Sequence, residues 1–403
     1  MKIGIFTDVY EPSINGVTTS IKTYRKSLEK IGHQVYIFAP STTGALPETN
    51  VFRLPAIDEL SPKDFPIAIP YIPSLAKTVK NLGIEIIHIQ LPFTVGFIGH
   101  RIAKKLHIAE VHTYHTLLTE YSHYVPSELL QPLVQYGLKK LSKNFCNSMD
   151  INIAPSTSMM ELLRSFGVKK PIVVNPTGID ISRFHHLNEA EKSKLFAEYK
   201  IPAHKKILLF GGRIAREKNL TVLCECYKEI RNTFPDTHLI FAGGGFATDE
   251  SELKAKIKEL GLTEFTTVTG FLKAEEIARF FGAADLFTFP SVTETQGIVL
   301  SEAMAGRTPV VAMNVFGPRD IVKNSEDGYL CDSQKEFQEK ILYLLSHEKE
   351  RVEMAAAAIK NCQRFSIEAT TDHLVEIYKE AIGISKKKKR NNIFRDFGNL
   401  FIK

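Results

Sequence analysis

The chain has 403 residues, more than one hydrophobic core usually holds, and its 44% apolar and 24% charged residues are ordinary for a soluble globular protein. No run reaches the roughly 20 apolar residues of a membrane-spanning helix. The formal net charge of +6 arises in residues 386–403, where seven basic residues face one acidic residue, so a local partner of this segment is favoured over nucleic acid.

The opening MKIGIFTDVY predicts a strand followed by a turn, whereas a signal peptide would place charged residues before an apolar run. The cysteines are odd in number and lack metal-type spacing: Cys146, Cys224, Cys226, Cys331 and Cys362. We therefore expect reduced thiols in a cytoplasmic protein.

The first half alternates short β-rich runs with helical patterns. Strands are predicted over residues 2–6, 34–38, 84–89 and 151–154, a helix over 19–32, and a Pro-rich loop over 54–73. Alternation of this kind indicates a parallel sheet with crossover helices.

Two polar segments of this half are candidate ligand sites. Asn15-Gly16 follows the first strand, and its glycine would let the backbone approach a ligand closely. The loop is not a GxGxxG fingerprint, which argues against a dinucleotide oxidoreductase. Residues 111–116, VHTYHT, contain His112 and His115, although most histidines are structural.

The alternating pattern then restarts. Strands are predicted over residues 206–210, 238–242, 266–269, 286–289 and 309–312, and glycines follow the first two directly. Glycines in that place are expected at the carboxyl ends of α/β sheets, where ligands bind. The sequence thus predicts two doubly wound α/β domains, 1–177 and 178–365, joined at the turn-rich NPTGID of residues 175–180.

Residues 210–219, FGGRIAREKN, combine a strand end, a glycine turn and two cations, Arg213 and Lys218. A guanidinium offers a planar fork for phosphate oxygens and an ammonium a point charge. By itself the segment is better explained as a solvated basic loop, but with the acids described next a phosphate clamp is favoured.

Residues 291–312 read SVTETQGIVLSEAMAGRTPVVA and place Glu294 eight positions before Glu302. On one ideal helix such a pair would lie ~80° and ~12 Å apart, so one helix face would not unite the two acids. If a helix begins near Gly297, the amides of Ile298 and Val299 point at an anion, and the acids reach different parts of an elongated ligand such as a sugar nucleotide. By spacing alone, the pair is better explained as a surface acid and a first-turn dipole acid.

The stretch TETQGIVLSEAMAGRTPVVA resembles the signature of the retaining, nucleotide-sugar-dependent glycosyltransferases of family four. Members of this family carry two glutamates separated by seven residues, followed by a helix of small residues and the sequence T-P-V-V-A. This chain departs from the family at two places. Arg307 stands where the family usually has glycine, and near the N-terminus Asn15-Gly16 keeps only the second glycine of a Gly-Gly turn. The resemblance covers nearly the whole chain. It implies the GT-B architecture of two Rossmann-like domains facing across a cleft, with a C-terminal helix, residues 366–385, that packs back on the N-terminal domain.

The resemblance also implies roles for single residues. Glu294 would meet the sugar hydroxyls and steady charge at the reacting carbon, Glu302 would take the ribose hydroxyls, and Arg213 and Lys218 would hold the diphosphate. The stretch HTYHTLLTEYSHYV resembles a motif of bacterial diacylglycerol glucosyltransferases, whose second histidine, here His115, contacts the donor sugar. Weaker candidates for placing the acceptor are His112, His123 and Tyr124. No cofactor and no essential metal are expected, because the cations and the helix start already supply positive potential.

Residues 386–403, KKKKRNNIFRDFGNLFIK, form a basic tail. Five basic residues precede one helix stripe of apolar residues: Ile393, Phe394, Phe397, Leu400 and Phe401. That composition is typical of an interfacial membrane helix, and Gly398 weakens it, so we expect reversible binding to an anionic membrane. A disordered solubilising tail is the alternative.

The sequence therefore predicts a hexosyltransferase, peripheral on the cytoplasmic face of the cell membrane, that moves glucose from UDP-glucose to diacylglycerol and gives an α-glycoside. GDP-mannose or UDP-galactose as donor stays open, as does phosphatidylinositol, a polyprenyl-linked saccharide or a soluble sugar as acceptor. A sugar-nucleotide-binding scaffold without activity is the non-enzyme alternative. The four residues Arg213, Lys218, Glu294 and Glu302 argue against it, because binding alone would not need all of them.

Overall fold

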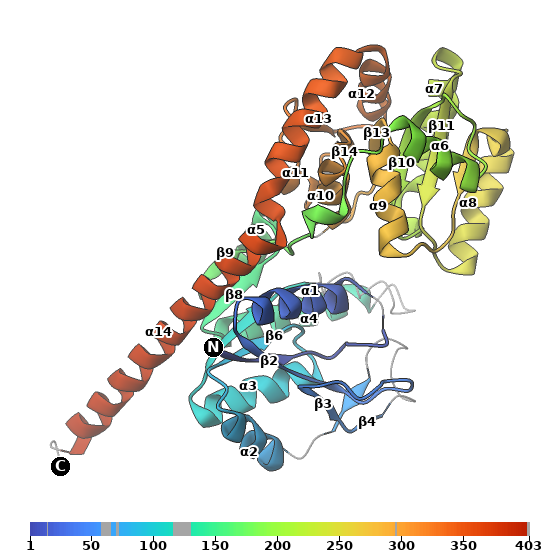
Figure 1. Ribbon diagram of the computed structural model, residues 1–403. Helices are drawn as coiled ribbons and strands as arrows, with labels where there is room; N and C mark the ends of the chain where they lie inside the picture. The colour runs from blue at the N-terminus through green and yellow to red at the C-terminus, as the bar shows by residue number, and fades with distance from the viewer. Residues whose placement is uncertain (14, 58–65, 70–71, 116–129, 295, 401–403) are drawn as a thin grey trace. The chain divides into compact units, whose positions relative to one another are not determined.

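The computed structural model describes residues 1–13, 15–57, 66–69, 72–115, 130–294 and 296–400, with side chains up to residue 389 (Figure 1). The chain divides into two compact units. The first contains Met1–Gly178 and Ile367–Lys403, and the second is Ile179–Ser366. Both are Rossmann-like α/β domains, as the sequence predicted.

A parallel seven-stranded sheet forms the centre of the first unit, in the order β3-β2-β1-β6-β7-β8-β9. Its strands are β1 (Lys2–Phe6), β2 (Gln34–Pro40), β3 (Val51–Leu54), β6 (Ile86–Ile89), β7 (Ala109–Thr113), β8 (Ile151–Ala154) and β9 (Ile172–Val174). The predicted loop over 54–73 contains a short antiparallel pair, β4 (Ala56–Ile57) and β5 (Ile67–Ala68), and residues 58–65 and 70–71 of it lie outside the described residues.

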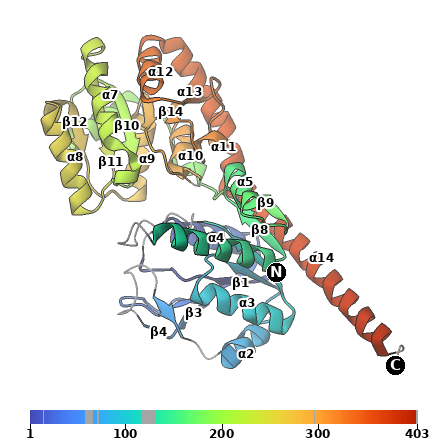
Figure 2. The ribbon, with the colours of Figure 1, turned by 180° about the vertical axis from the view of Figure 1, so that it is seen from behind.

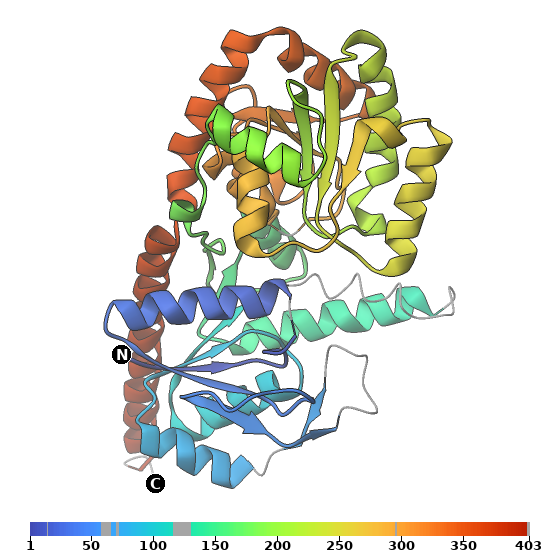
Figure 3. The ribbon, with the colours of Figure 1, turned by 45° about the vertical axis from the view of Figure 1, so that its right-hand side comes forward.

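Helices cover both faces of this sheet: α1 (Gly16–Lys30), α2 (Ile72–Leu82), α3 (Thr94–Leu106), α4 (Gln131–Ser148), α5 (Thr157–Ser165) and α14 (Ile367–Leu400). Helix α1 begins three residues before the predicted Thr19, because the Asn15 side chain accepts a hydrogen bond from the Thr18 amide at 2.9 Å and caps the helix. Figures 1 and 3 show α1 and α2 on opposite sides of the sheet.

The C-terminal helix α14 returns to the first unit, as predicted. Leu374, Ile377, Tyr378 and Ala381 are fully buried in the core that Ile3, Ile5 and other strand residues share with α1. Burying each large apolar side chain contributes about 1.5–3 kcal/mol, so several together hold this part of the helix on the domain. The helix continues without a break from residue 385 into the basic tail.

The second unit has its own parallel sheet, in the order β12-β11-β10-β13-β14-β15. Its strands are β10 (Lys206–Gly211), β11 (Thr237–Ala242), β12 (Thr266–Val268), β13 (Leu286–Phe289), β14 (Val310–Met313) and β15 (Gly328–Cys331). The strand order reverses between β10 and β13. Such a reversal is where ligands bind at the carboxyl ends of strands in open α/β sheets.

The helices around this sheet are α6 (Glu189–Glu198), α7 (Leu220–Thr233), α8 (Ala247–Glu259), α9 (Ala274–Ala283), α10 (Ile298–Ala305), α11 (Pro318–Ile321), α12 (Gln334–Ser346) and α13 (Glu348–Cys362). Helices α7 and α8 lie side by side in Figure 2. Aromatic rings fill the core on the strands themselves, with Phe210, Phe287 and Phe289 almost completely buried.

Candidate active site

The carboxyl ends of β10 and β13 carry most of the predicted site residues of the second unit. Arg213 and Lys218 lie in the loop after β10, and Glu294 lies in the loop between β13 and α10. Glycine is required in this region, because Gly243 has φ +144° and a Cβ atom there would lie 2.1 Å from the Gly212 carbonyl oxygen. The two loops after β10 and β11 are therefore packed backbone against backbone.

Lys218 and Glu294 form an ion pair between Nζ and Oε1, although 76 positions separate them in the chain. Their side chains are 18% and 12% exposed. The Ser291 hydroxyl donates to the same oxygen, Glu294 Oε1, at 3.0 Å and further restrains the carboxylate. The structure thus brings a cation and an acid of the predicted site together and keeps each charge compensated in this state.

Further bonds tie the two loops to each other. Asn219 Nδ2 donates to the Pro290 carbonyl oxygen at 3.5 Å, and Ser291 Oγ lies 3.3 Å from the Glu217 carbonyl oxygen, a second acceptor for its one proton. Asn219 itself has φ +57° and joins the short 3-10 helix Arg216–Lys218 to α7. The position of Lys218 is therefore set by the backbone on both sides of it.

The structure does not bring Arg213 into the Lys218–Glu294 pair. Its Nη2 pairs with Glu217 on the same loop, and its side chain is 52% exposed. An exposed ion pair of this kind contributes at most about 1 kcal/mol, so an anion could take the guanidinium from Glu217 at little cost.

Helix α10 begins directly after Gly297, as the sequence predicted. Gly297 is the N-cap of the helix and has φ +78°. The Cβ position of Gly212 is 3.7 Å from Val299 Cγ1, so the first turn of α10 lies against the glycine turn after β10. Among the described residues no side chain caps α10, so the amides of its first turn have no capping side chain there. These amides and Lys218 provide positive potential from neighbouring loops.

Glu302 lies in the second turn of α10 and is partly buried. Burial raises the pKa of its carboxyl from 4.5 to about 7, and the positive charge of Arg183 offsets part of this increase. The described residues offer Glu302 no hydrogen bond or ion pair within bonding distance, so its carboxyl is available to a ligand.

We expect the Glu302→Gln variant to lose a pH dependence of stability that the parent chain shows. Because the folded pKa of about 7 exceeds the unfolded value of 4.5, the folded chain binds more protons between those values, and its stability falls as the pH rises from 4.5 to 7. The slope for one proton is at most about 1.4 kcal/mol per pH unit.

Urea unfolding from pH 5 to 8, followed by circular dichroism because the chain lacks tryptophan, measures this slope. Glu264→Gln, at an exposed position of the same unit, controls for the loss of one charge. Equal slopes in the parent and Glu302→Gln chains would contradict the expectation.

In the first unit, Gly16 is the first residue of α1. A Cβ atom there would meet nothing within 4 Å, so the described surroundings leave open space at this point. Packing among the described residues therefore does not require glycine at position 16, and the close approach of a ligand stays a prediction.

His115 follows β7, and its Nε2 lies 2.6 Å from Oε1 of Gln90. Burial lowers the pKa of His115 to about 3, with a further decrease from the neighbouring His112, so the ring is neutral near pH 7. His112 is almost fully buried and bonds the Ile89 carbonyl oxygen through Nδ1 at 3.0 Å, which makes it part of the domain core. The acceptor candidates His123 and Tyr124 lie outside the described residues.

Sequence reasoning did not identify Ser291 and Gln90, which hold Glu294 and His115. Gln90 follows the predicted strand 84–89 directly, at the sheet edge where ligands bind, and that position could have singled it out. Ser291 offered no comparable signal, because its bond depends on how the loop after β13 folds.

Among the described ranges, no group of three or more His, Cys, Asp or Glu side chains is arranged to hold a metal ion. Likewise, no helix of the described part is both long and apolar enough to cross a bilayer.

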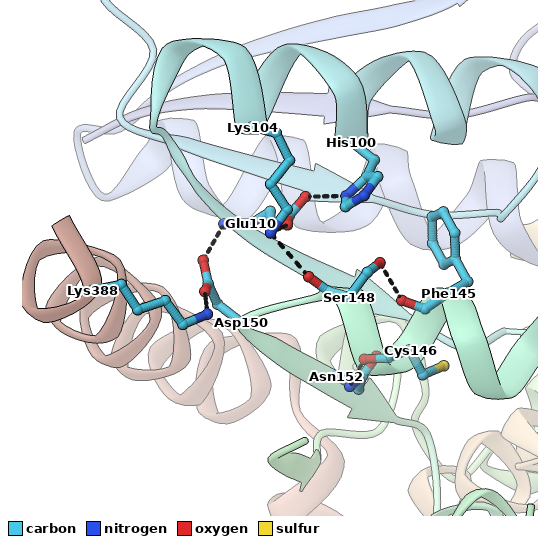
Figure 4. A network of polar contacts seen from close by, with 9 residues as sticks. All are labelled: His100, Lys104, Glu110, Phe145, Cys146, Ser148, Asp150, Asn152 and Lys388. Atoms are coloured by element: carbon cyan, nitrogen blue, oxygen red, sulfur yellow. Dashed lines mark hydrogen bonds and ion pairs between the residues drawn. The ribbon is translucent and has the colours of Figure 1, made fainter. Parts of the chain in front are cut away.

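The start of the basic tail is attached to the first unit through an acidic network (Figure 4). Lys388 on α14 forms an ion pair with Asp150, which is only 6% exposed. Asp150 Oδ2 also accepts from the Glu110 amide at 3.1 Å, and the Glu110 carboxylate bonds His100 Nδ1 at 2.8 Å and pairs with Lys104 at 3.0 Å. Lys388 therefore extends the contact of α14 four residues beyond Ile384, which still packs against the core of the first unit.

Comparisons with known proteins agree with this organisation. The family model described as Glycosyltransferase Family 4 matches residues 14–183, and the model described as Glycosyl transferases group 1 matches residues 191–361. An alpha-monoglucosyldiacylglycerol synthase of Streptococcus pneumoniae is 32% identical over 317 residues, which cover 77% of this chain and 71% of that protein. A GDP-mannose-dependent alpha-mannosyltransferase of Corynebacterium glutamicum is 27% identical over 401 residues, 96% of this chain and 91% of that one.

Among solved structures, the crystal structure of Anabaena HepE in complex with UDP superimposes with a TM-score of 0.76 and 18% identity. The alignment covers 94% of this chain and 100% of that chain. At this identity the likeness shows a shared fold.

Proposed function

Because the chain belongs to glycosyltransferase family 4, we propose that it transfers glucose from UDP-glucose to the free hydroxyl of diacylglycerol, with retention of configuration. The chief support is the 32% identity with a protein named alpha-monoglucosyldiacylglycerol synthase over 77% of the chain. The basic segment at residues 386–403 agrees with an acceptor that resides in a membrane.

We assign the stabilisation of the negative charge on the leaving group to Lys218, Arg213 and the start of α10. As the bond from the sugar carbon to the phosphate oxygen breaks, the diphosphate gains negative charge, and fixed cations stabilise that state more than the bound donor. The acceptor hydroxyl forms the new bond on the face that the diphosphate leaves, and a phosphate oxygen takes its proton. The cations thus act on the step in which charge develops.

The acids and the histidine bind the rest of the donor in this proposal. Glu294 meets the sugar hydroxyls, and its bond from Ser291 fixes the carboxylate for that contact. Glu302 accepts from the ribose hydroxyls, and the neutral ring of His115 orients the sugar.

A mannosyl transfer from GDP-mannose is the second candidate. It is favoured by the alpha-mannosyltransferase of Corynebacterium glutamicum, because that similarity extends over 96% of the chain, although its identity is lower at 27%. Both candidates use the same phosphate-binding residues and differ in the donor base, the sugar and the acceptor.

One assay separates the candidates. The full chain is incubated with UDP-glucose, UDP-galactose or GDP-mannose, each labelled in the sugar, and with vesicles that contain diacylglycerol or phosphatidylinositol. We expect label in the lipid phase only with UDP-glucose and diacylglycerol, and an α-linked product by NMR. Glu294→Gln serves as the matched control. Mannosyl-lipid formation without glucosyl-lipid would replace the first candidate by the second, and no transfer from any donor would refute both.

A further inference from the structure

Gln90 and His115 meet at the carboxyl edge of the first sheet. Strands β6 and β7 are parallel neighbours with Ile89 opposite His112, so residues just beyond both ends lie side by side. The Gln90 backbone amide donates to the Phe6 carbonyl oxygen at 2.9 Å, and the residue is only 3% exposed. The end of β1 therefore holds the backbone of Gln90, and the buried side chain of this residue contacts His115.

The contact determines which nitrogen of the ring carries the proton. A neutral imidazole has one N–H donor and one acceptor nitrogen, and the bond that one nitrogen makes decides the role of the other. Since Gln90 contacts Nε2 through its carbonyl oxygen Oε1, the proton is on Nε2. Nδ1 then carries a lone pair, and the described residues provide it with no hydrogen-bond donor.

Burial, with a smaller contribution from the neighbouring imidazoles, keeps the ring neutral without fixing its tautomer. The titratable side chains whose charges reach it are His112 on β7 and His88 on β6, and both are buried imidazoles. His88 bonds Tyr378 of α14 at 2.7 Å and Thr113 at 2.7 Å, so neither of its nitrogens is directed to His115 as a partner. Among the described residues, Gln90 is therefore the one whose hydrogen bond fixes the tautomer of His115.

We propose that Gln90 is a positioning residue that holds His115 as the Nε2–H tautomer, so that Nδ1 accepts a hydrogen bond from a hydroxyl of the sugar substrate. This inference rests on the proposed function for the identity of that hydroxyl. The tautomer itself follows from the contacts within the first unit.

Two substitutions at Gln90 change the ring in different ways. In Gln90→Glu, a carboxylate faces Nε2, favours the imidazolium and raises the pKa of His115. A protonated Nδ1 cannot accept a hydrogen bond from the sugar hydroxyl, so kcat/KM should fall tenfold per pH unit below the new pKa. The pH profile of the parent chain should lack this acidic limb. In Gln90→Leu, both tautomers become populated, and we expect kcat to fall about tenfold with the parent pH profile.

Asn175→Asp is the matched control. Asn175 is a buried amide of the same unit, and its Oδ1 lies 3.0 Å from Nδ1 of His373, so the substitution makes the same amide-to-carboxylate change beside another histidine. It should add no acidic limb to the pH profile of transfer. Circular dichroism of each variant checks the fold.

The tautomer is measured directly by long-range proton–nitrogen NMR of the full chain labelled in histidine, with the His115 signals assigned from His115→Asn. Protonated Nε2 and unprotonated Nδ1 are expected in the parent chain. Protonated Nδ1, or a Gln90→Glu pH profile identical to the parent, would overturn the inference. Absence of glucosyl transfer by the parent chain would refute the proposed function, while the NMR result would still decide the role of Gln90.

Discussion

Replacing Lys218 by alanine is expected to lower kcat by about 10²–10³-fold while raising the donor KM much less. The ammonium group compensates Glu294 in the absence of donor, and in the proposed reaction it stabilises the departing diphosphate. Its largest contribution therefore comes when charge develops on that group, which is an effect on kcat. Initial rates at varied UDP-glucose and saturating diacylglycerol measure both constants.

Lys218 also has a structural partner, so the loss of activity must be separated from the loss of an ion pair. Removing Lys218 leaves Glu294 partly buried without its cation, which destabilises the loop by itself. The double variant Lys218→Met with Glu294→Gln removes both charges and relieves this cost. If its kcat returned to within a few-fold of the Glu294→Gln value, Lys218 would act only as a partner of Glu294.

Lys205→Ala is the control for the cation. Lys205 pairs with Asp236 at 2.7 Å and lies just before β10, at the opposite end of the strand from Lys218. Its removal takes one positive charge from the same unit without touching the carboxyl edge of the sheet. An equal decrease of kcat in both variants would point to a general charge effect, and an unchanged kcat in Lys218→Ala would remove Lys218 from the mechanism.

The sheet strands and the start of α10 were predictable from the sequence. Apolar runs such as residues 206–210 and 286–289 are followed directly by glycine or proline. These local patterns predict strands correctly because a parallel sheet buries such runs on both faces. Gly297 marked the start of α10 for a similar local reason, since its φ of +78° is easily adopted by glycine.

The partners of the charged residues were not predictable in this way. Lys218 pairs with Glu294 across 76 positions and Lys388 with Asp150 across 238, and no periodic pattern specifies which loops meet. Arg213, which the family resemblance groups with Lys218, pairs with Glu217 instead. Sequence patterns indicate which residues can bind an anion, whereas tertiary folding decides which of them are compensated within the protein.

The partners of the basic tail were likewise not predictable from the sequence. The sequence predicted a basic amphipathic tail over 386–403 after the helix of residues 366–385, and the backbone continues α14 from that helix to Leu400. Lys388 stands seven positions after Ala381 and so shares the face of the helix that packs on the first unit. Lys386, Lys387 and Lys389 are exposed, and no ion pair joins them to the described residues. The lysines of one run therefore differ in their availability to a membrane.

Changing Lys386, Lys387, Lys389 and Arg390 together to glutamine is expected to weaken binding to anionic vesicles by roughly 4 kcal/mol, or about 10³-fold, because each basic residue near an anionic surface contributes about 1 kcal/mol. Donor binding should be unchanged, since the buried residues of α14 up to Ala381 remain in place. Sedimentation with vesicles of increasing anionic lipid content measures the affinity, and added salt should weaken the parent's binding.

Single substitutions test whether Lys388 is withheld from the membrane. Lys387→Gln should weaken vesicle binding about fivefold, whereas Lys388→Gln should change it by less, because Asp150 already compensates that charge. Asp150→Asn releases Lys388 and should strengthen binding by a similar factor. If the fourfold variant bound vesicles as tightly as the parent, the tail would not act through its charge. Equal effects of Lys387→Gln and Lys388→Gln would show instead that membrane lipids displace Asp150 from Lys388, and the acidic network would then release the tail on contact with the bilayer.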